Sequence, residues 1–375
     1  MDQSWIHNEQ AYVTLRAGGA NPAAGHFDAP HFATSVPSLP AGLSGLQLKL
    51  RNGGAATPDA SLTKASTYCR RSLTFSKDLP GGTPVHRIHE LSAYFGVPRL
   101  MIKDESYNPC GTHKDRKSAY VVRRALSFPK PPGAFCLITA GSAALSLSHF
   151  AAWRALPVVA FVGCLAGKER RLIGSACLKT IKLDLEGRRW SREELQSLAG
   201  KSTGRDVLDV TNVAAPYGAI AREIATYEPD FVVLPVGGGE LFVGLAEGLA
   251  AAGLRTRLIG VGVRRRDTAA DKLYASYSPY RDVVNSLTAE SSPHRLFYLD
   301  DESLLAETRA VLSKFMPCEP SSAVAFEALR FLKLKPGKSV MVINTGTFRR
   351  PRGTAGHTLP LFEPDIIKKS HDFRH

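Results

Sequence analysis

Short apolar segments alternate with segments of helical spacing along most of the chain, and this alternation constrains the fold more than any other feature. The expected strands span residues 99–103, 134–138, 157–162, 178–184, 207–210, 231–235, 257–263 and 339–344. Apolar side chains recur at helical spacing in 86–95, 115–128 and 142–156. Short apolar strands separated by helices favour parallel sheets that are buried on both faces. The sequence therefore predicts an α/β fold.

Three stretches lack this alternation. Residues 1–70 are rich in Gly, Pro, Ala and Ser, which predicts an N-terminal extension. Such an extension is either a mobile arm or a segment that wraps a neighbouring subunit. Residues 264–300 show no clear pattern and predict a long surface excursion, and residues 351–375 predict an irregular tail.

Composition excludes several classes of protein. The 375 residues are 44% hydrophobic and 22% charged, which is typical of a globular chain of about two domains. No apolar run is long enough to span a bilayer, and the first residues lack a signal pattern, so we expect a cytoplasmic protein with no membrane partner. Six cysteines without CxxC spacing argue against a disulfide framework or a metal site.

The net charge of +14 allows two interpretations. One is an anionic partner such as nucleic acid, for which Arg264-Arg265-Arg266 is the densest basic run. The other, which we favour, is a soluble surface rich in Arg and Lys. The basic run lacks the interleaved aromatic residues of a single-strand nucleic-acid platform, so no nucleic-acid partner is expected.

Lys114 is the first candidate for chemistry. It follows the expected strand 99–103 and a turn marked by Asn108-Pro109 and Gly111, and a helix is expected directly after it. The positive end of a helix dipole disfavours another cation, so this placement lowers the pKa of the amine and favours a nucleophile. On position alone, a solvated lysine in a first helical turn is the alternative.

Three other strand ends carry residues suited to small-molecule binding. Gly237–Gly239 stand between a strand and a helix, where backbone N–H groups converge on an anion. The segment 139–144 places small residues at a helix start and suits a carboxylate, although a plain helix cap explains it equally well. Thr345 ends the last strand. Ligands of open α/β sheets bind at the carboxyl ends of strands, so we expect these four segments to meet.

The order and spacing of these segments resemble the fold-type II pyridoxal-phosphate (PLP) enzymes, the group of tryptophan synthase β, threonine synthase and cysteine synthase. GGTPVHRIHEL is similar to the opening segment of that family, and NPCGTHKDR to its NPTGSxKDR lysine segment. TAGSAALS resembles its substrate loop, PVGGGEL its PVGGGGL phosphate loop and EPSSAVAFEAL its EPAGA helix. NTGT resembles the strand end that presents a hydroxyl to the pyridine nitrogen.

The resemblance implies an architecture of two open, twisted, mostly parallel sheets flanked by helices. Residues 71–117 and 223–350 would form the larger, PLP-binding domain. Residues 118–222 would form a smaller α/β domain that carries the substrate loop. The family resemblance also implies a homodimer that acts on an amino-acid substrate.

The resemblance further implies a role for each matched residue. Lys114 would be the catalytic residue and would hold PLP as a Schiff base, with His113 near the phosphate and Thr345 facing the pyridine nitrogen. The phosphate would be bound by the backbone of Gly237, Gly238, Gly239, Glu240 and Leu241. The substrate carboxylate would be bound by Thr139, Ala140, Gly141, Ser142 and Ala143.

Two positions depart from the family pattern. Ser142 stands where the family has an asparagine that contacts the cofactor hydroxyl, and Glu240 replaces the fourth glycine of the phosphate loop. An acidic side chain beside a dianion is unfavourable unless it points away. Glu240 could turn toward the substrate or toward solvent, and the sequence leaves this open.

The implied activity is PLP-dependent elimination or β/γ-replacement on an amino acid, of the threonine synthase-like or cysteine synthase-like kind. A non-catalytic paralogue that serves as a binding or scaffold protein is the alternative, and the two departures are its support.

Overall fold

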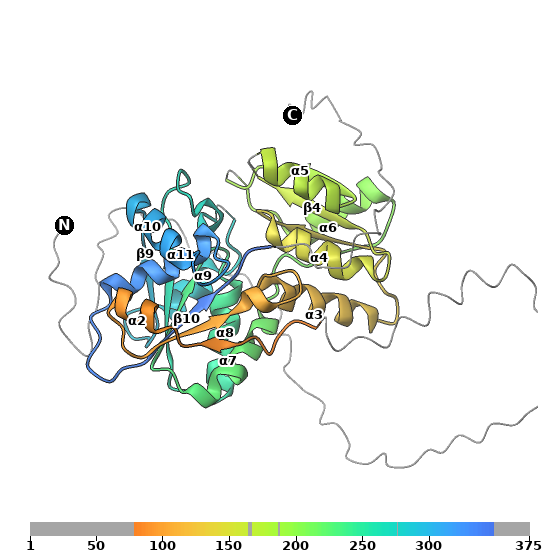
Figure 1. Ribbon diagram of the computed structural model, residues 1–375. Coiled ribbons are helices and arrows are strands. Elements are labelled where there is room, and N and C mark those ends of the chain that lie inside the picture. Colours follow the sequence, from red (N-terminus) through yellow and green to blue (C-terminus); the bar gives the residue numbers. More distant parts are fainter. Residues whose placement is uncertain (1–78, 164–166, 187, 276, 349–375) are drawn as a thin grey trace, which may run out of the picture. The chain divides into compact units, whose positions relative to one another are not determined.

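The computed structural model describes residues 79–163, 167–186, 188–275 and 277–348, and it has the α/β architecture expected from the sequence (Figure 1). Two sheets are present in this part of the chain, one of six strands and one of four. All strand pairs are parallel except one at an edge of the larger sheet. The extension over residues 1–70 and the tail over 351–375 lie outside the described residues.

The larger sheet has the strand order β1-β2-β10-β7-β8-β9. Its strands are β1 (Val85–His86), β2 (Leu100–Asp104), β7 (Phe231–Pro235), β8 (Arg257–Gly262), β9 (Arg295–Tyr298) and β10 (Val340–Asn344). Central β10 pairs Val342 with Ile102 on one side and with Val233 on the other. Only β1 runs antiparallel to its neighbour. The sheet is therefore of the parallel kind that needs helices on both faces.

Alternate residues of these strands pack into two separate cores. Ile102 and Val233 face a core shared with α2 (His89–Phe95), α10 (Glu302–Leu312) and α11 (Pro320–Glu327). Met101 and Val232 face a core shared with α7 (Gly218–Ile224), α8 (Glu240–Ala251) and α9 (Arg281–Leu287). The period of two along each strand explains why neighbours in sequence enter opposite cores.

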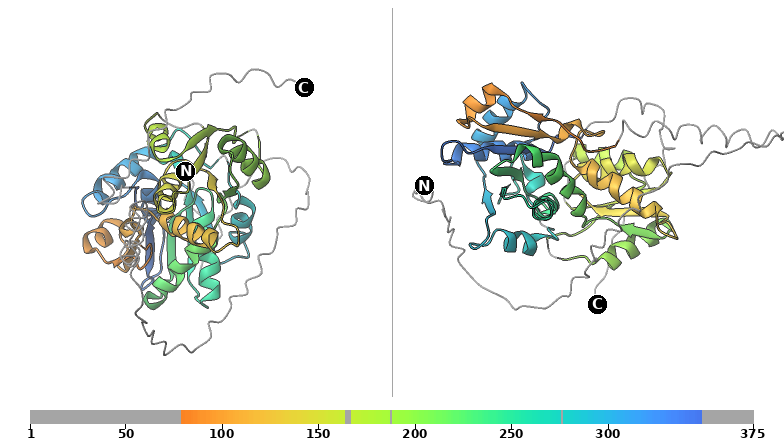
Figure 2. Two further views of the ribbon diagram at one scale, coloured as in Figure 1. Left: turned by 90° about the vertical axis from the view of Figure 1, so that its right-hand side faces the viewer. Right: turned by 90° about the horizontal axis from the view of Figure 1, so that it is seen from below.

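The smaller sheet has the order β5-β4-β3-β6 and is parallel throughout. Its strands are β3 (Ala134–Ile138), β4 (Val158–Val162), β5 (Lys179–Lys182) and β6 (Val207–Asp209). One face packs against α3 (Lys114–Leu126), α4 (Ser142–Ala152) and α5 (Gly167–Ala176), and the other against α6 (Arg192–Thr203). In the right-hand view of Figure 2, these yellow to light-green elements group at one end, away from the orange and blue strands of the larger sheet.

The domain division expected from the sequence, with its boundaries, stays a prediction. The smaller sheet draws all its strands from residues 134–209, and the larger sheet from 85–104 and 231–344. Helix α3 runs across the expected boundary at residue 117, because it begins beside the larger sheet and packs on the smaller one.

Helix α6 begins with a capping box, in which the Ser191 and Glu194 side chains each accept a hydrogen bond from the other residue's backbone N–H. Each expected strand is present, with bounds that differ by at most two residues at either end.

The expectation for residues 264–300 was wrong in part. This stretch contains α9 and the strand β9, which extends the larger sheet beyond β8. The four residues of β9 are half-buried or exposed because the strand lies at the sheet edge, so they lack the apolar run of a buried strand. The short strand β1 was also missed, because two residues are too few to show a strand pattern.

In the part of the chain that the structure describes, no helix is long and apolar enough to cross a membrane. The same residues contain no group of three or more His, Cys, Asp and Glu side chains arranged to hold a metal ion.

Candidate active site

The residues singled out in the sequence line one cavity of about 280 Å³ between the carboxyl ends of strands from both sheets. The expected site residues on its wall are His113, Lys114, Thr139, Ala140, Gly141, Ser142, Ala143, Gly237, Gly238, Gly239, Glu240, Leu241 and Thr345. The structure thus brings together four segments that are far apart in the sequence, as the strand-end argument predicted.

Lys114 begins α3, directly after a compact turn. Gly111 in this turn has φ of +76°, a value that favours glycine, and its N–H donates to the Asn108 carbonyl at 2.8 Å. The Asp115 carboxylate accepts a hydrogen bond from the Cys110 N–H at 2.6 Å, which fastens the turn to the helix start. The backbone around Lys114 is therefore held by a hydrogen bond within the turn before it and by one from the turn to the helix after it.

The lysine turn is also fastened to the end of β10. The His113 N–H donates to the Thr345 carbonyl at 3.2 Å, and Thr112 forms a β-bridge with Gly346. Gly346 has φ of +73°, and a Cβ there would lie 2.2 Å from the Gly111 carbonyl oxygen, so only glycine permits this approach. Lys114 and Thr345 are consequently fixed relative to each other by backbone.

Thr345 is held in turn by α11. The Ser322 hydroxyl donates to Asn344 Oδ1 and accepts from the Thr345 N–H, both at 2.9 Å. Asn344 Nδ2 donates to Asp104 Oδ1 at 2.8 Å across the neighbouring strand. The EPSSAVAFEAL segment thus supports the strand end that carries the hydroxyl.

Burial sets the protonation of the two basic residues at this turn. Burial lowers the pKa of Lys114, the Glu240 carboxylate raises it and the Lys117 ammonium lowers it again. Burial and the charge of Lys114 hold the pKa of His113 well below its usual value, so its ring is neutral at pH 7. The sequence argument for a lowered lysine pKa named the helix dipole, whereas desolvation is the larger cause here.

Glu240 points into the cavity, which answers the question that the sequence left open. It is 8% exposed and lies at the first position of α8. Its Oε1 accepts a hydrogen bond from Lys117 Nζ at 2.5 Å, and its Oε2 is 3.9 Å from Lys114 Nζ. The carboxylate is therefore turned away from solvent and toward two lysines.

The glycine segment before α8 leaves room for a ligand. A Cβ at Gly238 would meet no atom within 4 Å, so space is open beside this residue. At Gly239, φ is +89° and a Cβ would lie 2.8 Å from Tyr280 Cβ, so a side chain is excluded there. The helix that follows adds the positive end of its dipole. The local geometry is that of an anion-binding turn.

The segment 139–143 lines the same cavity. The Thr139 hydroxyl accepts a hydrogen bond from the Gly141 N–H at 2.9 Å, and Gly141 has φ of +139°. Gly141 is the N-cap of α4, and its N-terminal N–H groups lack a side-chain cap. Such a helix start can bind a carboxylate through its backbone donors.

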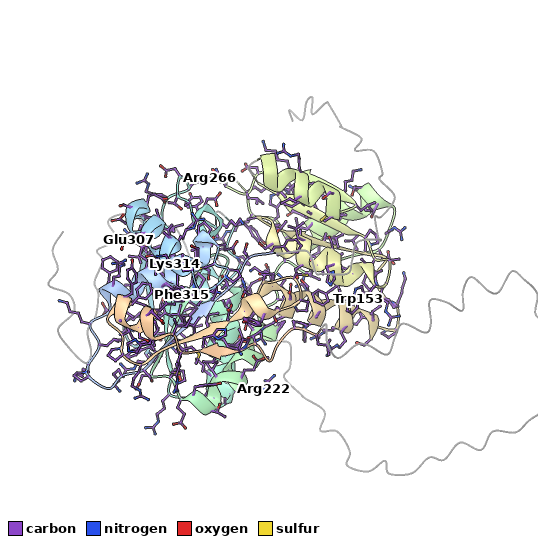
Figure 3. The ribbon with its side chains drawn as sticks, in the orientation of Figure 1. Trp153, Arg222, Arg266, Glu307, Lys314 and Phe315 are labelled. Atoms are coloured by element: carbon purple, nitrogen blue, oxygen red, sulfur yellow. The ribbon has the colours of Figure 1, made fainter. Side chains whose placement is uncertain are left out.

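Sequence reasoning missed several residues of the cavity wall. Lys117 lies one helical turn after Lys114 and could have been found from that spacing. Lys272 and Glu319 pair at 3.2 Å, and Glu319 belongs to a matched segment to which no role was assigned. Arg266, labelled in Figure 3, comes from the basic run after β8 and pairs with Glu186. Arg266 and Lys272 reach the cavity from the segment after β8, whose folding the sequence pattern does not show.

A network of buried charges lies behind the lysine turn. We call Lys103, Glu105, Arg116 and Glu223 the Arg116 network. The Arg116 guanidinium donates to both oxygens of Glu105 and to both oxygens of Glu223, at 2.6 to 2.8 Å. Lys103 Nζ lies 2.6 Å from Glu223. Thr83 and Asn108 each donate a further hydrogen bond to Glu105, so the GGTP segment is joined to the lysine turn.

A model of the family described as "Pyridoxal-phosphate dependent enzyme" matches residues 77–346. The chain belongs to this family. Its cofactor is PLP, as the resemblance implied. The match spans both sheets and every segment that lines the cavity.

One curated protein and several solved structures are similar to this chain at low sequence identity. A threonine synthase from Methanosarcina acetivorans is 26% identical over 197 residues, which is 47% of each chain. The chain thus spans about half the length of this curated relative. The structure of cysteine synthase from Entamoeba histolytica matches with a TM-score of 0.59 at 18% identity, over 81% of this chain and 94% of that one. The fungal L-serine ammonia-lyase of Rhizomucor miehei matches with a TM-score of 0.56 at 20% identity, over 72% and 94%.

The residues of the cavity fit PLP in three respects, and one residue opposes its binding by charge repulsion. A part-buried amine, an open glycine turn at a helix start and a strand-end threonine line the same cavity. The repulsion comes from Glu240, whose carboxylate shares the cavity with the site suited to a phosphate. The ammonium of Lys117, at 2.5 Å, offsets that negative charge.

Proposed function

We propose that this PLP enzyme eliminates or replaces a β- or γ-substituent of an amino acid, with Lys114 as the residue that carries the cofactor and moves the Cα proton. The observation that supports this most is the position of Lys114, which lies in one cavity with the glycine turn and the 139–143 segment. A cofactor site and a carboxylate site are thereby within reach of a single amine.

Each part of the cavity has a task in this proposal. The backbone N–H groups from Gly237 to Leu241 bind the phosphate, and the helix dipole of α8 adds to this binding. The segment 139–143 binds the substrate carboxylate. PLP, when bound, supplies an electron sink for the negative charge that forms at Cα.

Proton transfer falls to Lys114. A general base works best when its pKa lies near the operating pH, and burial moves the pKa of this amine in that direction. The neutral His113 ring adds no positive charge next to it. Thr345 would offer the pyridine nitrogen a neutral hydroxyl and no carboxylate, which by family resemblance favours elimination and replacement.

A second candidate function is a non-catalytic binding protein that keeps the fold. The inward position of Glu240 favours it, because a carboxylate in the anion site weakens phosphate binding unless it is compensated. Close pairing with Lys117 supplies that compensation, so we retain the enzyme as the first proposal.

A substrate screen tests the proposal. The PLP-loaded chain should turn over at least one member of a set containing O-phosphohomoserine, O-acetylserine, O-acetylhomoserine, serine and threonine. Released phosphate, acetate or keto acid is measured against a Lys114→Ala control. No turnover of any member, together with retained PLP, would favour the non-catalytic paralogue.

We further propose that the chain forms a homodimer and works in the cytoplasm, with residues 118–222 as the smaller domain.

A further inference from the structure

Three ionisable side chains meet at the amino end of α8, and the proposed function leaves their arrangement unexplained. Glu240 Oε1 is 2.5 Å from Lys117 Nζ, and Glu240 Oε2 is 3.9 Å from Lys114 Nζ. One carboxylate therefore lies between two amines, with one oxygen toward each. PLP chemistry of the proposed kind needs only Lys114.

This arrangement is buried and anchored, unlike a surface ion pair. Lys117 is 5% exposed and Glu240 is 8% exposed. Lys117 Nζ also donates to the Thr211 carbonyl at 2.7 Å, and the Val213 N–H donates to Glu240 Oε1 at 3.4 Å. The pair is thus held by backbone from the segment between β6 and α7.

The two lysines are engaged to different degrees. Lys117 has two hydrogen-bond acceptors, Glu240 and Thr211. The distance from Glu240 to Lys114 exceeds hydrogen-bond length, and 27% of the Lys114 side chain is exposed to the cavity. Lys117 is accordingly the fixed counter-ion of Glu240. Lys114 interacts electrostatically with both groups but forms no hydrogen bond to Glu240.

We propose that Glu240 and Lys117 are positioning residues that together set how readily the Lys114 amine gives up and takes back its proton. The idea rests on the proposed function, which uses this amine as a proton carrier. Glu240 favours the protonated amine, and Lys117 opposes it. Removing one member of the pair should therefore shift the amine in the opposite direction from removing the other.

Other charged groups face Lys114 and are accounted for. Glu319, the N-cap of α11, also raises the pKa of Lys114, and Lys272 pairs with that carboxylate at 3.2 Å. His113 is neutral because burial lowers its pKa. Neither Glu319 nor His113 forms part of the Lys117–Glu240 pair, although the charge of Lys117 is one of the lesser causes that lower the pKa of His113.

The test measures the protonation midpoint of Lys114 directly. The full-length chain, without added PLP, is labelled briefly with acetic anhydride over a range of pH, and the Lys114 peptide is quantified by mass spectrometry. Only the neutral amine reacts, so the labelling rate follows deprotonation. We expect Glu240→Gln to lower the midpoint by about one pH unit and Lys117→Met to raise it by about one unit. The double variant should return to within about half a unit of the unsubstituted chain.

Two controls separate this effect from a general disturbance of the fold. Lys117→Arg keeps the charge and should leave the midpoint within a few tenths of a unit of its original value. Lys130→Met removes the cation of an exposed pair of the same length, Lys130 with Asp206 at 2.5 Å, and should not move the Lys114 midpoint. Circular dichroism checks each variant, and if Lys117→Met does not fold, the sign of the Glu240→Gln shift alone decides.

Shifts of the same sign in both single variants, or no shift in either, would overturn the inference. The proposed function is judged by a separate result, which is fixation of PLP on Lys114 by borohydride. If PLP is fixed there but the midpoints do not move, the function stands and the charge pair has no role in tuning the amine. If the midpoints move as expected but PLP is not fixed, the function fails and the coupling stands.

Discussion

The chain buries charge in two regions that lie side by side, and it treats them differently. In the Arg116 network the guanidinium has four hydrogen bonds to two carboxylates, and Glu105 is fully buried. In the cavity, the carboxylate of Glu240 is shared between a bonded lysine and a more distant one. A network of many strong hydrogen bonds is rigid, whereas an incompletely paired amine can change its protonation.

The sequence positions of the two regions are interleaved. Lys114 and Lys117 belong to the cavity, and Arg116 between them belongs to the network, because side chains of adjacent helical residues point in different directions. One turn of α3 therefore carries both the reactive amine of Lys114 and the central cation of the Arg116 network. We infer that the network fixes the position of Lys114 and that the cavity charges set its acidity.

Arg116→Met should produce the largest effect on stability. The substitution leaves the carboxylate of Glu105 buried without its cation, and losses of this kind cost about 3–5 kcal/mol. The pKa of Glu223 should also rise. Burial alone would raise that pKa, and the hydrogen bonds and charge of Arg116, together with those of Lys103, bring it down to about 2. Urea unfolding at pH 7 measures the free-energy change. A loss below about 1 kcal/mol would mean that the network does not brace the lysine turn.

Lys117→Met should cost less, about 1–2 kcal/mol, although Lys117 is about as buried as Arg116. After the substitution, Glu240 still has Lys114 at 3.9 Å as a neighbouring cation. The same unfolding experiment places the two variants on one scale. Equal losses would erase the distinction between a bracing network and an adjustable cavity.

Glu327→Gln should cause no loss of stability at neutral pH, and its effect should depend on pH. Glu327 is buried, and among the described residues its Oε1 has no hydrogen-bond partner. Burial, aided by the charge of Asp301, raises its pKa to about 7. Between the unfolded value near 4.5 and about 7, the folded chain binds more protons, so the unfolding free energy falls as pH rises through this window.

The amide that this substitution introduces carries no charge at any pH. Glu327→Gln should therefore be more stable than the unsubstituted chain by about 3 kcal/mol at pH 8 and nearly equal to it at pH 4.5. Unfolding curves at the two pH values provide the comparison. A variant that is less stable at pH 8 would show that the glutamate has a cationic partner at neutral pH, as Glu105 has.

Strands buried on both faces could be predicted from the sequence, and so could the edge strands β5 and β6 of the smaller sheet, but the edge strands β1 and β9 of the larger sheet could not. The apolar run of FVVLP matches β7 residue by residue, because a central strand meets helices on both sides. Strand β9 reads Arg-Leu-Phe-Tyr and is half exposed, so nothing in its pattern marks it as part of a sheet.

The candidate site also has features that could be predicted from the sequence and features that could not. Backbone-determined features, such as the glycine turn and the lysine turn, follow from local sequence and were predicted. The direction of the Glu240 side chain was not, because it depends on Lys117 and on backbone groups near Thr211, which are distant in the sequence. Lys272 and Glu319 were overlooked for the same reason, since their pairing joins a loop to the start of α11.

The central claim is that Lys114 carries the cofactor, and borohydride reduction tests it most directly. The full-length chain is loaded with PLP, reduced, digested and mapped by mass spectrometry, with Lys114→Ala as the control. We predict a reduced PLP adduct on the peptide that contains Lys114, and no stable adduct in the control. An adduct on another lysine, or equal labelling of Lys114→Ala, would contradict the account.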